Sequence, residues 1–266
     1  SKGYDVLLDA AAYVPTNRLD LTQVKPNFVS LSFYKMFGFP TGIGALLIRK
    51  DSFHKIQKPW FAGGTVSFVS VGIQEHYLYN NHERFEDGTI NYLHIPVIKN
   101  GLAFLESVGI EKIQKRVKSL ANYLYAGLHE LRHDNGKPLV HIFGPANFDK
   151  RGGTIILNFF DRYGEVISFE AIEKLANRKQ ISIRTGCFCN PGIDEINHCV
   201  TNDEIAMYLT GKEMTYTEMV YLIGRMRGAV RVSVGIATNQ SDLDEFIAFS
   251  SSIKNRAVDE VMAQCV

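Results

Sequence analysis

The sequence predicts an α/β protein built in two parts, an incomplete α/β domain over residues 1–100 and a small α+β domain over residues 101–266. Two patterns carry this prediction. Short apolar runs in the first fifty residues are rich in branched side chains and bounded by Asp, Pro or Gly, as buried strands are. The later sequence alternates such runs with segments whose apolar residues recur every three or four positions, as in amphipathic helices.

Three buried strands are expected in the first domain, at residues 6–8, 28–31 and 43–48. Strands buried on both faces need helices on both sides, and the connections between these runs are too short to provide them. Since no strand precedes the first one, we expect the N-terminal part of this domain to be missing. The stretch from 50 to 95 is expected to be irregular, because Pro and Gly residues punctuate it.

The second domain is expected to contain a long helix, since apolar residues recur at helical spacing from Ile113 to Leu131. A cap at Ser241, with Asp244 reaching back to it, marks the start of the last helix. The last helix is expected at 241–253, and six further elements are expected, namely strands at 139–143, 154–160, 181–184 and 229–234 and helices at 168–178 and about 215–226.

The composition is that of a globular chain without a strong charged field. Lys and Arg number 29 against 28 Asp and Glu, for a formal net charge of +1, so nothing in the charge favours nucleic acid as a partner. No apolar stretch approaches the roughly 20 residues of a membrane-spanning helix. The four cysteines are too few for a secreted disulfide scaffold, so a reducing, cytoplasmic location is expected.

Asp9 and Lys35 follow two neighbouring predicted strands. A carboxylate at the carboxyl end of a buried strand lies where open α/β sheets bind ligands, although a turn-initiating Asp is the alternative. A lysine after a strand is ordinarily solvated, but partial desolvation prepares such an amine for Schiff-base chemistry. A pyridoxal phosphate (PLP) site needs both groups, a lysine for the aldehyde and a carboxylate for the pyridine nitrogen.

A loop at residues 184–192, with the sequence RTGCFCNPG, carries two cysteines beside an arginine. A neighbouring arginine favours a thiolate and makes a cysteine nucleophilic. One alternative is a zinc site formed by Cys187, Cys189, His198 and Cys199, but its spacings are poor zinc templates. The other alternative is that the loop cysteines are inert.

Arg231 lies inside an apolar strand-like run, VRVS at residues 230–233. Arginine is rarely buried without an anion. The fork of its guanidinium suits a carboxylate, so Arg231 is a candidate for binding a substrate carboxylate. An ion pair with an Asp or Glu of the chain is the alternative.

Seven segments, taken in order, resemble the class V, fold-type I PLP enzymes, and within them the cysteine desulfurases. The likeness is greatest to the desulfurase-like domain of molybdenum cofactor sulfurases. The segments are LDAAA (8–12), NRLDL (17–21), SFYKMFG (32–38), GGTV (63–66), RFEDGT (84–89), the loop at 184–192 and VRVS (230–233). The resemblance implies the aspartate aminotransferase-like fold of PLP-dependent transferases. Residues 1–100 would then form the C-terminal portion of the large PLP-binding domain.

The resemblance also implies a role for each matching residue. Lys35 would bind PLP covalently, Asp9 would pair with the pyridinium nitrogen, and Ser32 would bind the cofactor phosphate. Thr89 would reach the phosphate in the neighbouring subunit of a homodimer. Arg231 would hold the substrate carboxylate.

The implied activity is that of a PLP-dependent cysteine desulfurase, in which L-cysteine becomes L-alanine and Cys189 carries the sulfur as a persulfide. The sulfur acceptor would be the molybdenum cofactor or a carrier protein. Three positions depart from common family patterns, Ala12, Tyr34 and Asp194. Two alternatives stay open: another class V reaction, by an aminotransferase, lyase or epimerase, and a non-catalytic fragment or subunit that is inactive as this chain.

Overall fold

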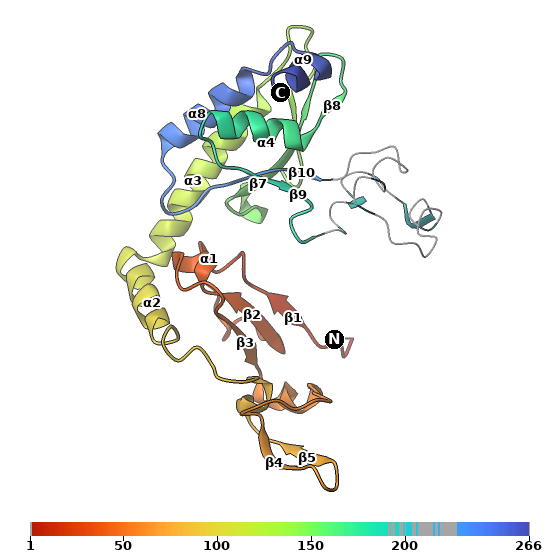
Figure 1. Ribbon diagram of the computed structural model, residues 1–266. Helices are drawn as coiled ribbons and strands as arrows, with labels where there is room; N and C mark the ends of the chain where they lie inside the picture. Colours follow the sequence, from red (N-terminus) through yellow and green to blue (C-terminus); the bar gives the residue numbers. More distant parts are fainter. Residues whose placement is uncertain are drawn as a thin grey trace. The chain divides into compact units, whose positions relative to one another are not determined.

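The computed structural model describes residues 2–190 and 228–265, and between them residues 192, 195, 196, 199, 201–203, 206, 215 and 218 (Figure 1). Contacts divide the chain into two compact units, Ser1–Gln114 and Lys115–Val266. The predicted domain boundary at residue 100 falls inside α2 (Val97–Val108), whereas the boundary between the contact units falls inside α3 (Ile110–His129). In the part of the chain that the structure describes, no helix combines the length and the apolar character needed to cross a membrane.

A three-stranded sheet forms the centre of the first unit. Its strands are β1 (Leu7–Asp9), β2 (Phe28–Ser32) and β3 (Gly44–Ile48), in the order β1-β2-β3. The three predicted strands are therefore confirmed to within one or two residues at each end. β1 runs parallel to β2 with Asp9 opposite Ser30, and β3 runs antiparallel to β2.

The expected burial of these strands is wrong. Leu7 is 63% exposed, and Leu46 and Leu47 of β3 are 50% and 42% exposed. Because successive residues of a strand point to opposite faces, apolar side chains meet solvent on both faces of this sheet. The core of the sheet is a small cluster around Val29, which packs with Ala10 and other apolar residues that follow β1. Branched, apolar composition thus identified the strands but not what covers them.

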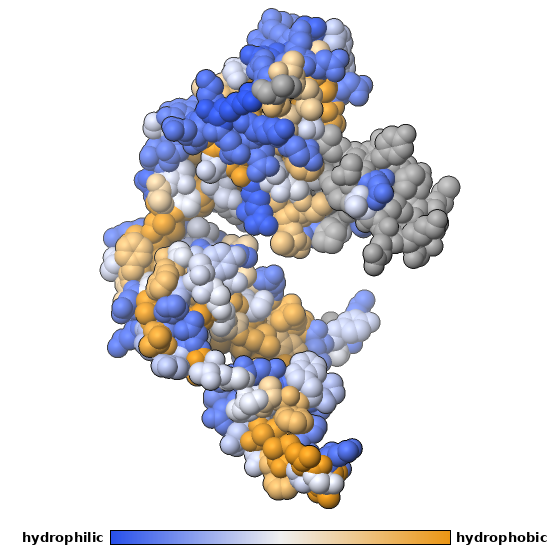
Figure 2. Space-filling model, in the orientation of Figure 1, coloured by the Kyte–Doolittle hydropathy of each residue, from blue (hydrophilic) through white to orange (hydrophobic). Residues whose placement is uncertain are grey.

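The stretch from 50 to 95 contains more regular structure than predicted. It holds a hairpin of β4 (Val66–Ser70) and β5 (Glu75–Leu78) between two short 3-10 helices, η1 (Lys50–Lys55) and η2 (His82–Phe85). A register shift between Val66 and Phe68 breaks the alternation that would have revealed the hairpin. Apolar residues gather at its surface (Figure 2), where Phe68, Val69, Val71, Ile73 and Tyr77 are exposed.

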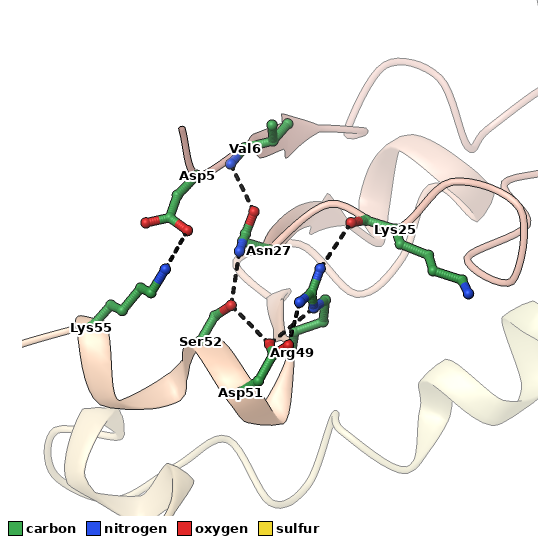
Figure 3. A network of polar contacts seen from close by, with 8 residues as sticks. All are labelled: Asp5, Val6, Lys25, Asn27, Arg49, Asp51, Ser52 and Lys55. Carbon is green, nitrogen blue, oxygen red and sulfur yellow. Dashed lines mark hydrogen bonds and ion pairs between the residues drawn. The ribbon is translucent and has the colours of Figure 1, made fainter. Parts of the chain in front are cut away.

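A polar network holds the amino ends of β1 and β2 against η1 (Figure 3). The Asn27 side chain accepts a hydrogen bond from the Val6 backbone at 2.9 Å and donates one to the buried Ser52 hydroxyl at 2.8 Å. Lys55 pairs with Asp5 at 2.7 Å. These contacts fix the amino ends of β1 and β2. Asp9 and Ser32 lie at the opposite, carboxyl ends of the same strands.

An antiparallel sheet and its helices form the second unit. The sheet order is β6-β7-β10-β9, with β8 paired to β7. One hydrophobic core includes Leu124 and Leu128 of α3, Leu157 of β7, Ile172 of α4 and Phe246 of α8, none more than 2% exposed. The elements are β6 (Val140–Ile142), η3 (Phe148–Lys150), β7 (Thr154–Phe160), β8 (Val166–Ile167), α4 (Phe169–Arg178), β9 (Arg184–Gly186), β10 (Ala229–Ser233), α8 (Gln240–Ser251) and α9 (Val258–Ala263).

Most predicted elements of this unit are confirmed, with two corrections. The strand expected at 181–184 lies at Arg184–Gly186, because only these residues pair with β10. The helix predicted at 241–253 is α8, and it is not the last one, because α9 follows it. It begins at Gln240 rather than at Ser241, because Asn239 forms the cap: its side chain accepts the Asp242 N–H at 3.1 Å, and the Asp242 carboxylate accepts the Asn239 N–H at 2.9 Å. The helix expected at about 215–226 lies outside the described residues, apart from 215 and 218.

Candidate active site

Three of the predicted site residues of the first unit lie at one edge of its sheet. Asp9 ends β1 and Ser32 ends β2, and the two strands are parallel neighbours, so both residues lie at the carboxyl edge. Lys35 follows in the short helix α1 (Tyr34–Phe37), which ends at Gly38. Gly38 has a φ of +81°, a left-handed conformation that glycine adopts without strain, and its N–H donates to the Tyr34 carbonyl at 2.8 Å.

Asp9 is exposed, and one of its carboxylate oxygens is already engaged. Oδ1 accepts the Ala11 N–H at 3.0 Å and the Ser30 hydroxyl at 3.3 Å. These two bonds orient the carboxylate, while Oδ2 accepts no hydrogen bond from a described residue. No cation among the described residues pairs with Asp9, so the carboxylate can accept a hydrogen bond from a ligand.

Lys35 is an exposed amine without a hydrogen-bond or ion-pair partner among the described residues. Ser32, at the end of β2, is partly buried. A free amine, an oriented carboxylate and a hydroxyl at one sheet edge match the three parts of PLP, which are an aldehyde, a ring nitrogen that is protonated in use, and a phosphate. The residues present therefore fit this cofactor.

Thr89 lies in a different part of the same unit, in the exposed loop after η2. The preceding Gly88 has a φ of +75°, and its N–H donates to the Gly63 carbonyl at 2.8 Å. This bond joins two of the segments that resemble the PLP enzymes, GGTV and RFEDGT. The Thr89 side chain has no hydrogen-bond partner among the described residues.

The second unit brings together two arginines and a cysteine. Arg231 of β10 lies directly opposite Arg184 of β9 in the antiparallel register, and opposite residues project to the same face of a sheet. Arg184 Nη2 lies 4.0 Å from the Cys189 sulfur. The Arg231 guanidinium lies 5.2 Å from the centre of the Phe188 ring, within the range of a cation–π contact.

Arg231 is a partly buried cation without a carboxylate partner among the described residues. Its Nε is buried without a hydrogen-bond partner, and none of the ion pairs between described residues includes it. Burial, and next the positive charge of Arg184, lower the pKa of Arg231, while Cys189 partly opposes this effect. An anion placed between the two guanidinium groups would offset both the burial of Arg231 and its repulsion by Arg184. The alternative of an ion pair with an Asp or Glu finds no partner in the described part of the chain.

The cysteine loop turns sharply at Phe188 and Cys189. The Asn190 N–H donates to the Cys187 carbonyl at 3.0 Å, and the two central residues have positive φ angles of 54° and 60°. Two positive φ angles are typical of a type I′ turn, in which Gly, Asn and Asp dominate. A phenylalanine and a cysteine in this conformation cost about 1–3 kcal/mol each, and such strain clusters at active sites. The turn exposes the Cys189 thiol.

The described residues contain no group of three or more His, Cys, Asp or Glu side chains arranged to hold a metal ion. The predicted zinc alternative included His198, which lies outside the described residues. The structure places two further residues beside the predicted ones. Arg184, predicted only as the arginine next to the loop cysteines, also lies opposite Arg231, a pairing that depends on strand register. Phe188 contacts Arg231 and has no sequence signal beyond its place next to Cys189.

Comparison with known proteins decides the family. A family model described as "Aminotransferase class-V" matches residues 1–246. The chain belongs to this family. It is 36% identical over 251 residues to the molybdenum cofactor sulfurase of Homo sapiens, and the match covers 92% of this chain and 28% of that protein. It is 39% identical over 258 residues to the molybdenum cofactor sulfurase of Bombyx mori, covering 91% of this chain and 31% of that protein.

Solved structures confirm the fold of this family member. A cysteine desulfurase from Thermococcus onnurineus NA1 superimposes with a TM-score of 0.68 at 22% identity, covering 94% of this chain and 52% of that one. The Escherichia coli cysteine desulfurase CsdA gives 0.67 at 18% identity, covering 99% and 53%. The chain thus has the predicted fold of PLP-dependent transferases. It spans about half of these structures and about a third of the curated relatives it matches.

Proposed function

We propose that the chain carries part of the active site of a PLP-dependent cysteine desulfurase. In the overall reaction the carbon–sulfur bond of L-cysteine breaks, a sulfur–sulfur bond forms at Cys189, and the products are L-alanine and a persulfide on the enzyme. PLP supplies an electron sink when it is bound. Lys35 binds the cofactor and moves the proton at the substrate α-carbon.

The arrangement of Cys189, Arg184 and Arg231 is the observation that carries this proposal. A nucleophilic thiol needs exposure and a positive surrounding, and the strained turn and Arg184 provide them. A substrate that brings its own carboxylate needs a cation without a carboxylate partner, and Arg231 has no such partner in the described part of the chain. An amino acid held at Arg231 would therefore present its side chain toward the same face as the cysteine.

The cofactor role rests on the sheet edge of the first unit. There Asp9 would hold the pyridinium nitrogen protonated, because its Oδ2 accepts no bond from a described residue. Ser32 would donate its hydroxyl to the phosphate. Thr89, exposed and without a described partner, would reach the phosphate in the neighbouring subunit of a homodimer. The exposed apolar hairpin β4–β5 supports association with a second copy, because exposed apolar patches mark interaction sites.

The molybdenum cofactor is the acceptor that the relatives favour. Proteins named as molybdenum cofactor sulfurases match more than nine-tenths of this chain at 36–39% identity. The persulfide sulfur of Cys189 would pass to that cofactor, which would be a substrate of the reaction. A cytoplasmic location follows from the low cysteine content of the sequence.

Incubation with PLP followed by borohydride reduction is expected to label Lys35 and no other lysine. The reason is that Lys35 is the free amine at the edge that carries Asp9 and Ser32. Mass spectrometry of the digested chain would locate the pyridoxyl group. The matched control is Lys35→Ala, which should remain unlabelled. Labelling scattered over exposed lysines, or its absence, would show that this chain does not organise the cofactor and would favour a non-catalytic fragment.

Replacement of Arg231 by glutamine is expected to raise KM for cysteine by about 30- to 100-fold, because a charge-assisted hydrogen bond to the carboxylate is lost. Steady-state kinetics with cysteine would measure this effect. With cysteamine, which lacks the carboxylate, wild type and variant should differ little. The control is Arg116→Gln, since Arg116 is exposed in the same unit and donates to the Thr238 carbonyl. An equal effect on cysteamine would contradict the carboxylate role.

A further inference from the structure

Lys58 is a buried lysine outside the residues assigned so far. Its side chain is 4% exposed, and lysine is almost never fully buried unless it is paired. Nζ forms an ion pair with Asp87 and donates to the Arg84 carbonyl at 3.1 Å. It also lies 5.6 Å from the centre of the Trp60 ring. The ammonium group is thus held from three sides.

Asp87 makes a second contact of its own. Its second carboxylate oxygen accepts the Trp60 indole N–H at 3.2 Å. The hydrogen bond from Lys58, and then that from Trp60, keep the pKa of Asp87 below its usual value. Because a buried ammonium group without a counter-ion is costly, Asp87 is fixed wherever Lys58 is fixed.

One backbone hydrogen bond extends this clamp toward Thr89. The Gly88 N–H donates to the Gly63 carbonyl at 2.8 Å. On the other side, Arg84 donates to the Ile56 carbonyl at 2.8 Å. In the segment that leads into Thr89, residues 84, 87 and 88 are therefore tied to residues 56–64, whereas the Thr89 hydroxyl has no hydrogen-bond partner among the described residues.

We propose that Lys58 is a positioning residue for Thr89. Its ion pair with Asp87 fixes the Gly88–Thr89 segment, so that the Thr89 hydroxyl is held ready for a phosphate oxygen. A donor that is already in place loses little conformational entropy when the phosphate binds. The inference rests on the proposed function, because it takes the phosphate of PLP as the partner of Thr89.

The first test is the exchange of backbone amides with deuterium. Replacing Lys58 with methionine keeps most of the length of the side chain and removes the charged Nζ. The Gly88 amide should then exchange at least about tenfold faster than in the wild type, since its bond to Gly63 loses support. Lys55→Met is the matched control, because it removes the exposed ion pair with Asp5 in the same unit (Figure 3). It should leave the exchange of Gly88 unchanged.

The second test compares PLP with pyridoxal, which lacks the phosphate. Absorbance titration of Lys58→Met should show about a tenfold weaker Kd for PLP and a nearly unchanged Kd for pyridoxal. Thr89→Ala should show the same selective loss, and the double variant should lose no more than Thr89→Ala alone. If Lys58→Met does not fold, Lys58→Gln replaces it, since it removes the charge and keeps an N–H that can donate to Asp87.

The outcomes separate this inference from the proposed function. Equal losses for PLP and pyridoxal in Lys58→Met would overturn the inference, because the ion pair would then serve the fold alone. The inference is also overturned if Thr89→Ala weakens the binding of PLP but not of pyridoxal, while Lys58→Met weakens neither. If Thr89→Ala binds PLP as the wild type does, the phosphate role of Thr89 is wrong, and the inference fails with it even where Gly88 exchanges faster.

Discussion

Replacing Cys189 with serine is expected to lower sulfide release from cysteine, measured with a reductant present, by about 10³-fold. The hydroxyl of serine cannot accept a sulfur atom as a thiolate does, so neither the persulfide nor alanine would form. Mass spectrometry after incubation with cysteine and PLP would show one added sulfur atom on the loop peptide of the wild type. That added atom should be missing from the variant.

Cys187→Ser provides the matched control, because it changes a thiol two residues away in the same loop. It should retain sulfide release within a few-fold, since Cys189 occupies the central position of the turn and lies near Arg184. Persistent turnover of cysteine by Cys189→Ser to a product other than alanine would contradict the desulfurase proposal. It would point to another class V reaction, by an aminotransferase, lyase or epimerase.

The strain in the cysteine loop gives this prediction its structural basis. Phe188 and Cys189 both adopt positive φ angles, which neither side chain favours. The ring of Phe188 lies against Arg231 and the sulfur of Cys189 lies near Arg184. The two central side chains of the strained turn thus each contact an arginine.

The local parts of the site could be predicted from the sequence. Asp9 and Lys35 each follow a short apolar run, and parallel strands bring their carboxyl ends to one edge. Arg231 is a candidate because a charged residue inside an apolar strand needs an anion. In each case a run of apolar residues predicts the strand, and the one polar or charged residue in or after it is the candidate site residue.

The long-range parts could not be predicted. Lys58 and Asp87 are separated by a hairpin, and a lysine in a loop gives no local sign that it is buried. The pairing of Arg184 with Arg231 depends on strand register, which the sequence of either strand alone does not define. The exposure of Leu46 and Leu47 was missed for a similar reason, since apolar composition shows that a strand can be buried and not what covers it.

Replacing Asp161 with alanine is expected to lower the free energy of unfolding of the second unit by about 3–5 kcal/mol. Asp161 is 2% exposed, and its carboxylate accepts four backbone N–H groups. Those of Tyr163, Gly164 and Glu165 lie at 2.8, 2.8 and 2.9 Å, and that of Val258 lies at 3.2 Å. Alanine would leave these donors without an acceptor, which costs far more than the net value of the bonds.

The dependence of this effect on pH has a defined sign. Burial alone raises the pKa of Asp161, but the hydrogen bonds from Glu165, Tyr163, Val258 and Gly164 outweigh it and lower the pKa in the folded chain. The stabilisation is therefore complete above the pKa of the unfolded chain, about 3.9, and is lost as the pH falls through the lower folded value. The difference between wild type and Asp161→Asn should shrink over the same acid range.

Chemical denaturation followed by two probes measures the loss of stability of the second unit separately from that of the first. Trp60 is the single tryptophan and lies in the first unit, so its fluorescence reports on that unit. Circular dichroism reports the helices, most of which belong to the second unit. Asp161→Ala should shift the dichroism transition to lower denaturant, whereas Asp149→Asn, which alters an exposed ion pair with Lys118, should shift neither transition. Wild-type stability in Asp161→Ala would mean that water replaces the carboxylate and that the four bonds do not hold the turn to α9.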